Sequence, residues 1–523
     1  MTVINKIVAC FGVALLGVLQ VQAQMYGAAD SAFGTNGMKS VDFGSKTDQC
    51  RSSVLDNQGR IWLGGYTEGN VSINSSFTRL DTLGGLTPGF KDNGIGVLDF
   101  DPNGNEGVFC MAVDQSNRVY GVSLIDGAVS GDVLVFRMNL EGVLDTNFGK
   151  NGYLTHEVSS ADDFPHSMLI DENNRPVIMG YSELATDDLF VLRLLENGDR
   201  DSSFSADGVA FFDPLNLDNS PAGIAIRPTA MGGGYYIGSY QNQGGSKVAS
   251  ITSVSKNGNL NIDLGGPGMA HFRKSGWSTT SQDIVMIGSH LYIGGTYRGS
   301  NDNQDAFISC IGLDGKLNVD YGDSGSVVII NTPANLDHEA FYKLKVASDS
   351  SIYAAGIAQI NGDYLILTAH IDPSGSKVGL FGNKGGFHIT ALLNGSTSFS
   401  VTGMAIDDVR GRLFVTGAFE INSEIDAYAY AFKTKATTPA GPNAVQMLVK
   451  RLTVYPNPSR GSVNLPEMEH GELGVYASNG QYMGMFEIEN GQVSLPSSLR
   501  SGVYFLRVTD GNTVYTAKLN LIK

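Results

Sequence analysis

The stretch 145–152 reads DTNFGKNG, with an aromatic residue in its fourth place and glycine in its fifth and eighth places. Six other stretches repeat this signature with small changes: DSAFGTNG (30–37), TPGFKDNG (87–94), DSSFSADG (201–208), NIDLGGPG (261–268), NVDYGDSG (318–325) and VGLFGNKG (378–385). The final glycines, Gly37, Gly94, Gly152, Gly208, Gly268, Gly325 and Gly385, are separated by 57, 58, 56, 60, 57 and 60 residues. Such a regular period indicates one supersecondary unit that stacks against copies of itself.

Each repeat also carries strand and hairpin patterns. A short β-rich stretch such as 38–43 follows the signature, and after a loop an apolar strand runs into a tight polar turn. The turns stand in LDNQGRIWLGG (55–65), VDQSNRVYGVS (113–123), IDENNRPVIMG (170–180) and IDDVRGRLFVTG (406–417). One more strand follows, as at 189–194. Four antiparallel strands repeated around an axis predict propeller blades.

The number of repeats predicts the number of blades. The period of about 58 residues is longer than that of WD or kelch repeats, and the seventh hairpin is followed by a closing strand at 427–433 without an eighth signature. We therefore expect an all-β chain with a seven-bladed β-propeller at 24–433. The fourth-place residues are expected to wedge between blades, with a looser contact at Leu264: Phe33, Phe90, Phe148, Phe204, Leu264, Tyr321 and Phe381.

Composition agrees with this fold class and excludes some partners. The chain has 523 residues, of which 66 are glycine and only 17% are charged, and the repeats show no helical periodicity. Abundant glycine with short apolar runs is typical of all-β proteins with many tight turns. The net charge of -17 disfavours nucleic acid and anionic membrane surfaces, because both require a basic surface. Cations, sugars and basic proteins remain compatible partners.

The N-terminus reads as a cleavable secretory signal at 1–23. Lys6 precedes an apolar stretch at 7–19, and small residues precede Gln24, near which the mature chain is expected to begin. A membrane anchor is the alternative, but the apolar run is short, and no later segment is long and apolar enough to span a bilayer. The remaining cysteines, Cys50, Cys110 and Cys310, are odd in number, so at least one has no partner within the chain; a Cys50–Cys110 bridge is left open.

A small β-domain is expected at the C-terminus. The stretch 434–446 is rich in Thr, Pro, Gly and Ala and reads as a linker. The strands that follow are separated by Pro, Asn and Gly turns, and at 447–523 they suffice for a small β-sandwich. Three motifs stand in order within it: LTVYPNPSRGSV (452–463), LGVYASNGQ (473–481) and LRSGVYFLRV (499–508).

Two resemblances follow from these motifs. The signature with its Asp-led hairpin resembles the delta-60 repeat of secreted bacterial proteins, which implies a propeller-like fold and no single activity. The C-terminal set resembles the type A sorting domain of the type IX (Por) secretion system of Bacteroidetes. That resemblance implies export to the cell surface or medium, with the secretion machinery as partner and the tail then removed. The matching positions are Tyr455, Pro456, Asn457, Pro458, Gly461, Gly480, Gly502 and Tyr504; their alternative role is to form turns and core.

One pattern in the ring suggests a ligand site. A polar residue, in most repeats acidic, stands eight residues before the hairpin position: Asp48, Glu106, Asp163, Asn219 and Glu339. If the strand that follows is the innermost one, these side chains ring one mouth of the central channel. A ring of carboxylates could hold a hard cation such as calcium through oxygen ligands. The alternative is that each side chain caps its own loop by accepting backbone N–H groups.

The sequence leaves three function classes open. The leading one is a non-enzymatic, exported propeller that binds a glycan or protein ligand. The second is an extracellular polysaccharide lyase or hydrolase that uses the acidic mouth and a histidine from another blade. His166 could join Asp163 at that mouth. The third is a structural component or adhesin of the cell surface. No nucleophile elbow or phosphate loop is present in the sequence, and no catalytic residue is assigned.

Overall fold

The computed structural model describes two β-rich parts of the chain, 26–434 and 448–522. Within them it leaves out 45–46, 70–71, 88, 92–93, 103, 127–129, 214–216, 267, 275, 300–303, 330–335, 361–362, 380, 384, 391–395, 397, 467, 478–481 and 511–512. The expected signal at 1–23 and nearly all of the expected linker therefore lie outside the described residues. Among the described residues no helix combines the length and apolar character needed to cross a bilayer.

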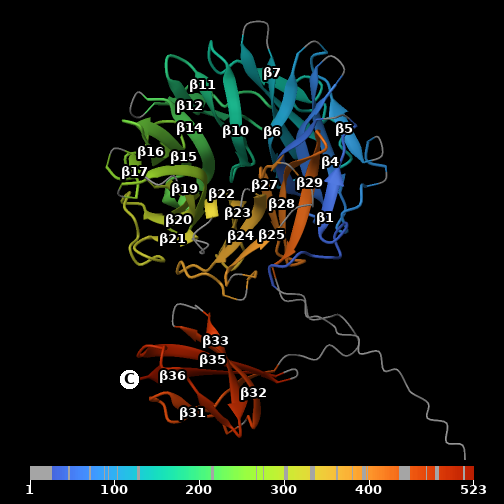
Figure 1. Cartoon of the computed structure of the whole chain (residues 1–523). Helices are drawn as coiled ribbons and strands as arrows, with labels where there is room; N and C mark the ends of the chain where they lie inside the picture. The colour runs from blue at the N-terminus through green and yellow to red at the C-terminus, as the bar shows by residue number, and fades with distance from the viewer. Residues whose placement is uncertain are drawn as a thin grey trace, which may run out of the picture.

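The first part is the predicted propeller, and its described strands form seven blades (Figure 1). The first blade consists of β2(Asp48–Leu55), β3(Ile61–Glu68), β4(Ile73–Leu80) and β5(Ile95–Leu98). The second consists of β6(Glu106–Val113), β7(Val119–Asp126), β8(Gly131–Met138) and β9(Tyr153–His156). The third consists of β10(Asp163–Ile170), β11(Pro176–Glu183), β12(Asp187–Arg193) and β13(Val209–Phe212). All pairs within these blades are antiparallel. A single turn of 3-10 helix, η1(Thr229–Met231), interrupts the strands of the fourth blade.

The other four blades repeat this plan. The fourth consists of β14(Asn219–Arg227), β15(Gly234–Gln243), β16(Ser246–Ser255) and β17(Met269–Phe272), and the fifth of β18(Ser278–Ile287), β19(His290–Arg298), β20(Gln304–Gly312) and β21(Ser326–Ile329). The sixth consists of β22(Leu336–Val346), β23(Ile352–Ile360), β24(Asp363–Ile371) and β25(Phe387–Thr390). The seventh begins with the short strands β26(Ser398–Phe399) and β27(Gly403–Asp407) and continues with β28(Arg412–Ile421), β29(Glu424–Lys433) and β1(Met38–Val41). The first strand of each blade contacts the first strands of both neighbours, and β2 meets β27 to complete the circle. The first strands are therefore the innermost ones. This meets the condition that the sequence analysis set for a ring of side chains at one mouth of the channel.

The ring is closed by the N-terminal strand β1. It pairs antiparallel with β29 of the last blade, from Met38 opposite Tyr430 to Val41 opposite Ala427. The strand after every signature is likewise the outermost strand of the preceding blade, so the sequence repeat and the blade are offset by one strand. The sequence analysis placed that strand in the blade that follows it, and took 427–433 as the closing strand; the structure corrects both points.

The signature is an interblade joint. In the copy at 145–152, Gly149 has φ 53° and donates its N–H to the Asn197 carbonyl of the next blade at 2.8 Å, while Gly152 has φ 99° and donates to Phe148 at 2.9 Å. These left-handed conformations are the reason for glycine at both places. In the seventh copy one residue is inserted, and Gly386, not Gly385, makes the equivalent bond, to Phe381.

The fourth-place side chains of the signature are buried between blades, as predicted. Phe148 is fully buried, and the turn residue Gly198 of the next blade lies against its ring, where a Cβ would come within 3.0 Å of the ring. All seven positions are at most 2% exposed: Phe33, Phe90, Phe148, Phe204, Leu264, Tyr321 and Phe381. Leu264 is as buried as the aromatic residues. The looser contact expected there does not expose its side chain to solvent.

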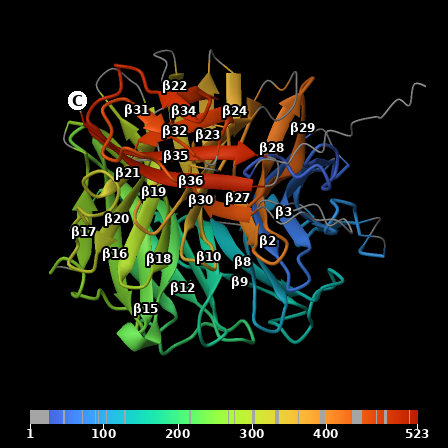
Figure 2. The ribbon, with the colours of Figure 1, turned by 90° about the horizontal axis from the view of Figure 1, so that it is seen from below.

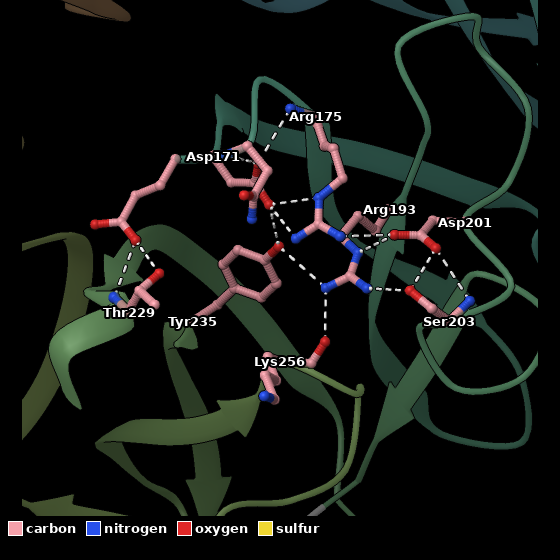
Figure 3. A network of polar contacts seen from close by, with 10 residues as sticks. Asp171, Arg175, Arg193, Asp201, Ser203, Thr229, Tyr235 and Lys256 are labelled. Atoms are coloured by element: carbon pink, nitrogen blue, oxygen red, sulfur yellow. Dashed lines mark hydrogen bonds and ion pairs between the residues drawn. The ribbon is translucent and has the colours of Figure 1, made fainter. Parts of the chain in front are cut away.

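Buried arginines link neighbouring blades. Figure 3 shows the guanidinium groups of Arg175 and Arg193 directed at the same carboxylate, Asp201, at 2.9 and 2.8 Å. Arg193 continues to the Lys256 carbonyl of the next blade at 2.7 Å, and Tyr235 of that blade donates to Asp171 at 3.0 Å. The contact ties the third blade to the fourth. Three other arginines donate to a turn carbonyl of the following blade in the same way: Arg79 to Leu140, Arg137 to Glu196 and Arg412 to Thr82.

The C-terminal part is a separate small β-fold with its own core. Its described strands are β30(Leu448–Arg451), β31(Ser462–Asn464), β32(His470–Ala477), β33(Tyr482–Glu489), β34(Gln492–Ser494), β35(Gly502–Asp510) and β36(Thr513–Leu521), in the order β30-β36-β35-β32-β33-β34-β31. Figure 2 shows β35 and β36 side by side, in agreement with their antiparallel pairing. Leu465, Leu473, Val475 and Leu519 are fully buried in this core.

Candidate functional site

The residues predicted to ring the channel mouth begin or lie near the start of the innermost strands. Asp48, Glu106, Asp163 and Asn219 are the first residues of β2, β6, β10 and β14, and Glu339 lies in β22. All innermost strands point the same way along the axis of the ring. The residues at their starts therefore lie at one end of the ring. Their side chains are at most 2% exposed. They are therefore turned into the blades and away from open solvent.

The aspartates are held by the loops that lead into their own strands. Asp48 accepts the Phe43 backbone N–H at 2.6 Å and the Thr67 hydroxyl at 2.6 Å. Asp163 accepts the backbone N–H groups of Val158 and Ser159 at 2.8 and 2.9 Å. These bonds fix the entry of the chain into the innermost strand. They are the bonds expected for the capping role that the sequence left open as an alternative.

The other positions vary this arrangement. One carboxylate oxygen of Glu106 accepts the Phe100 N–H at 2.7 Å, and the other has no hydrogen-bond partner among the described residues. Burial raises the pKa of Glu106 against the lowering effect of its backbone hydrogen bonds. The Asn219 amide donates to the Leu217 carbonyl at 2.7 Å and accepts from Gln241 at 2.7 Å.

A small acidic cluster surrounds one member of the set. Carboxylate oxygens of Asp42, Asp48 and Asp426 lie within 4.8 Å of one another. The pKa of Asp426 is raised, first by burial and then by the charges of Asp42 and Asp48. Carboxylates at this spacing suit a hard cation, but Asp48 already accepts two hydrogen bonds. Calcium binding at the channel mouth stays a prediction.

The histidines do not converge on this mouth. The His166 Nδ1 bonds to the Ser167 hydroxyl at 2.8 Å, whereas Asp163 bonds to its own loop. Burial, and then the charge of Lys343, lower the pKa of His166 to about 3, so the imidazole is neutral at physiological pH. His156 and His271 lie on the outermost strands β9 and β17 and belong to different blades.

The innermost strands carry charged residues that the sequence analysis did not single out. In six blades the innermost strand carries a β-bulge. The residue after the bulge bonds to the next blade in two of them, where Ser52 accepts the Met111 N–H and Asp283 accepts the Leu344 N–H. Asp283 of β18 and Lys343 of β22 occupy this position in adjacent blades. The charge of Lys343 affects the pKa of Cys110 and His166, which belong to the second and third blades.

Sequence reasoning missed these residues because their position is occupied by different residue types in different blades. The set is Ser52, Cys110, Ser167, Gly223, Asp283, Lys343 and Gly403. An alignment of repeats detects a residue type that most repeats share, and here no type occurs in more than two of the seven blades. The signal that could have found them is the hydrophobic pattern of β22, where two lysines interrupt the strand FYKLKV (341–346). The thiols of Cys50, Cys110 and Cys310 are free and buried.

The motif residues of the C-terminal domain gather near strand β36. The Asn457 side chain donates to the Lys518 carbonyl at 2.7 Å and accepts from the Asn520 N–H at 2.9 Å. Tyr504 is buried and donates its hydroxyl to the Arg500 carbonyl at 2.8 Å, whereas Tyr455 is 52% exposed. Pro456 and Pro458 both follow cis peptide bonds, Gly461 has φ 121° and Gly502 begins β35. Gly480 lies outside the described residues. Most of these residues shape turns around one edge of the fold.

Residues 453–522 match the model of a known family, described as the secretion system C-terminal sorting domain. The tail is a secretion sorting domain. The chain is therefore a cargo of a secretion system, and the sorting domain supports its delivery to the cell surface or the extracellular space. A search of curated protein sequences finds no significant match.

A search of solved structures finds two polysaccharide lyases among its matches. The lyase Uly1 is 10% identical, with a TM-score of 0.42 over 79% of this chain and 98% of that chain. A family PL25 ulvan lyase, bound to -[GlcA(1-4)Rha3S]-, is also 10% identical, with a TM-score of 0.44 over 76% of this chain and 96% of that chain. At this level of similarity no residue role is transferred from the lyases to this chain.

Proposed function

We propose that this protein is an exported binding protein whose propeller is carried across the outer membrane by the type IX secretion system. The observation that carries the proposal is the sorting domain at 453–522. The order of its motifs resembles type A domains of that system in Bacteroidetes, and the ring resembles delta-60 repeat proteins. The apolar N-terminus, read as a Sec signal at 1–23, would bring the chain to the periplasm first.

The interaction with the secretion machinery is assigned to the C-terminal domain. Its core is self-contained, with Leu473, Val475 and Leu519 fully buried, so it can be recognised as a folded unit. Tyr455 and Phe505 are 52% and 47% exposed, which leaves apolar side chains available to a partner. The motif residues act mainly by shaping this surface, because the polar side-chain atoms of Asn457 and Tyr504 form hydrogen bonds to backbone groups.

Binding is the role that the ring geometry supports best. Seven blades converge on one axis, and the predicted mouth residues Asp48 and Asp163 are engaged in loop hydrogen bonds. A general acid and base need access to a substrate, and these buried carboxylates do not offer it. A polysaccharide lyase or hydrolase acting through the axial groups is the second candidate, since Asp283, Lys343 and His166 come from three different blades. An adhesin is a special case of the binding role.

Tail deletion and tail transfer test the export proposal. In a bacterium with a type IX system we expect the full chain in the medium or on the surface, and a variant without 447–523 in the periplasm. A fluorescent protein fused to 434–523 behind a Sec signal should be exported, and the same fusion should be retained in a strain without the system. Equal export with and without the tail would overturn the proposal.

Product analysis separates the binding role from the enzymatic one. The full mature chain is incubated with acidic and neutral polysaccharides, and the shortening of the polymer is followed together with retention on a column of the same polymer. We expect retention without shortening. Shortening that is lost on replacement of Asp283 or His166 would establish the enzyme instead.

A further inference from the structure

The core of the C-terminal domain covers one face of its three neighbouring strands β36, β35 and β32 (Figure 2). Successive side chains of a strand point to opposite faces of the sheet. Leu506 of β35 stands between Val475 of β32 and Ala517 of β36, and all three belong to the core. The residues at the alternate positions of these strands therefore lie on the opposite face.

That opposite face carries an aromatic pair beside a lysine. In the register of the sheet, Phe505 of β35 stands between Tyr476 of β32 and Lys518 of β36. Phe505 is 47% exposed in the full chain, Lys518 is exposed and Tyr476 is half-buried. Val503, which is half-buried, and Asn520, which is exposed, form the next cross-strand pair on the same face. We call these five residues the aromatic face.

The exposure of Phe505 marks this face as a contact surface. Of the described aromatic side chains on the strands of this domain, only that of Phe505 is exposed. An aromatic side chain in the middle of a sheet leaves a large apolar area in water, and apolar patches of this kind occur where another molecule binds. The face therefore has the composition of an interface that is uncovered in the free chain.

The sorting motif holds the backbone beneath the aromatic face. The Asn457 side chain donates to the Lys518 carbonyl at 2.7 Å and accepts the Asn520 N–H at 2.9 Å. It thereby fixes β36 at the two residues that this strand contributes to the face. Tyr504, the neighbour of Phe505 in β35, is buried and donates its hydroxyl to a backbone carbonyl at 2.8 Å. Two motif positions thus stabilise the strands at the residues that form the face.

Lys518 adds a charge that suits an acidic partner. Among the described residues no carboxylate oxygen lies within 4.0 Å of its ammonium group, although acidic residues outnumber basic ones by 52 to 35 in the chain. A lysine at the edge of an apolar contact binds a carboxylate of the partner through a charge-assisted hydrogen bond, which also fixes the orientation of the complex. The complementary surface is an apolar pocket with a carboxylate at its rim.

We propose that the aromatic face docks into such a pocket on a protein of the secretion machinery. The proposal rests on the export function proposed above and names the surface of the tail that the machinery recognises. Phe505 fills the pocket, and Lys518 pairs with the carboxylate at its rim. Tyr476 lies beside Phe505 and extends the apolar contact. Asn457 is a positioning residue, because it holds the strand that carries Lys518.

Export of the full chain by a bacterium with a type IX system tests the aromatic face. Phe505→Ser and Lys518→Glu should each lower the exported fraction about tenfold or more, with the protein retained in the periplasm, because a few central residues carry most of the energy of an interface. Arg460→Glu makes the same change of charge at an exposed position in the turn before β31. This control should be exported as the wild type.

Thermal unfolding of the purified full chain separates recognition from folding. Phe505 and Lys518 are exposed, so both variants should unfold near the wild-type temperature. The aromatic face is overturned if both variants are exported as the wild type, if Arg460→Glu is retained equally, or if export is lost only together with a lowered unfolding temperature. Tail-dependent export of the wild type and of both variants would leave the export function intact, whereas export of the wild type without its tail would remove that function.

Discussion

Replacing Arg193 by methionine should reveal how much the arginine contacts contribute to ring stability. Arg193 and Asp201 are 1% and 4% exposed, and the variant loses their 2.8 Å ion pair, the 2.7 Å hydrogen bond to the Lys256 carbonyl and the contact with the Phe204 ring at 4.5 Å. Removing one partner of a buried pair costs about 3–5 kcal/mol. Since Arg175 still contacts Asp201, we expect about 3 kcal/mol.

Urea unfolding followed by tryptophan fluorescence measures this loss. The only tryptophans, Trp62 and Trp277, both belong to the ring, so the signal is independent of the sorting domain. Lys256→Met removes a nearby exposed charge but keeps the carbonyl that Arg193 uses, and its effect should stay within about 0.5 kcal/mol. The reasoning is refuted if Arg193→Met unfolds at the same urea concentration as Lys256→Met.

The same contact predicts a pH dependence. Burial works to raise the pKa of Asp201, but hydrogen bonds from Ser203 and the charges of Arg193 and Arg175 outweigh it, so the pKa is lowered. A lowered carboxyl pKa contributes stability that is present above the unfolded value of about 3.9 and is lost as the pH falls below it. The difference in unfolding free energy between wild type and Asp201→Asn should therefore shrink on acidification below about pH 4.

Three further outcomes are expected. Gly65→Ala should lower the melting temperature, because its Cβ would lie 1.7 Å from the Gln49 carbonyl oxygen, whereas Gly379→Ala, with open space around it, should leave the temperature unchanged in calorimetry. The three free thiols of the mature chain should react with a disulfide reagent only after denaturation, since they are buried and burial raises the pKa of Cys50 to about 12. Asp426→Asn relieves like-charge repulsion, so in the presence of a chelator it should raise the melting temperature. The gain in unfolding free energy should be less than about 1 kcal/mol. Calcium binding at that cluster predicts the reverse order when calcium is added.

The sequence carried enough information for the ring because its signature encodes backbone conformation. Positions such as Gly149 and Gly152 need left-handed φ values, and this need recurs wherever one blade meets the next. The register of strands within a blade can be predicted from the sequence patterns of those strands. The strand with which a short, separate strand pairs cannot be predicted in this way. Nothing local to 38–41 indicates that β1 pairs with β29, because that pairing arises only when the circle closes.

The candidate site was predictable only in part. The alignment of repeats located Asp48 and Asp163 at the start of the innermost strands, but their hydrogen-bond partners depend on loops whose conformation the pattern does not determine. Lys343 was missed by the same method, because a bulge shifts the side-chain alternation by one residue. In addition, no residue type occupies this position in more than two of the seven blades. Sites at a symmetry axis are built from what differs among repeats, and a repeat alignment reports what they share.

The pairing of β1 with β29 joins the first and last strands of the ring, and it has a consequence for quality control during synthesis. A chain that is truncated during synthesis lacks β29, so β1 has no strand to pair with. The unpaired strand edges of such an open ring favour aggregation. Such a fragment also lacks the export address, which follows the last blade at 453–522. A chain that carries the sorting domain has therefore already received every strand of the ring.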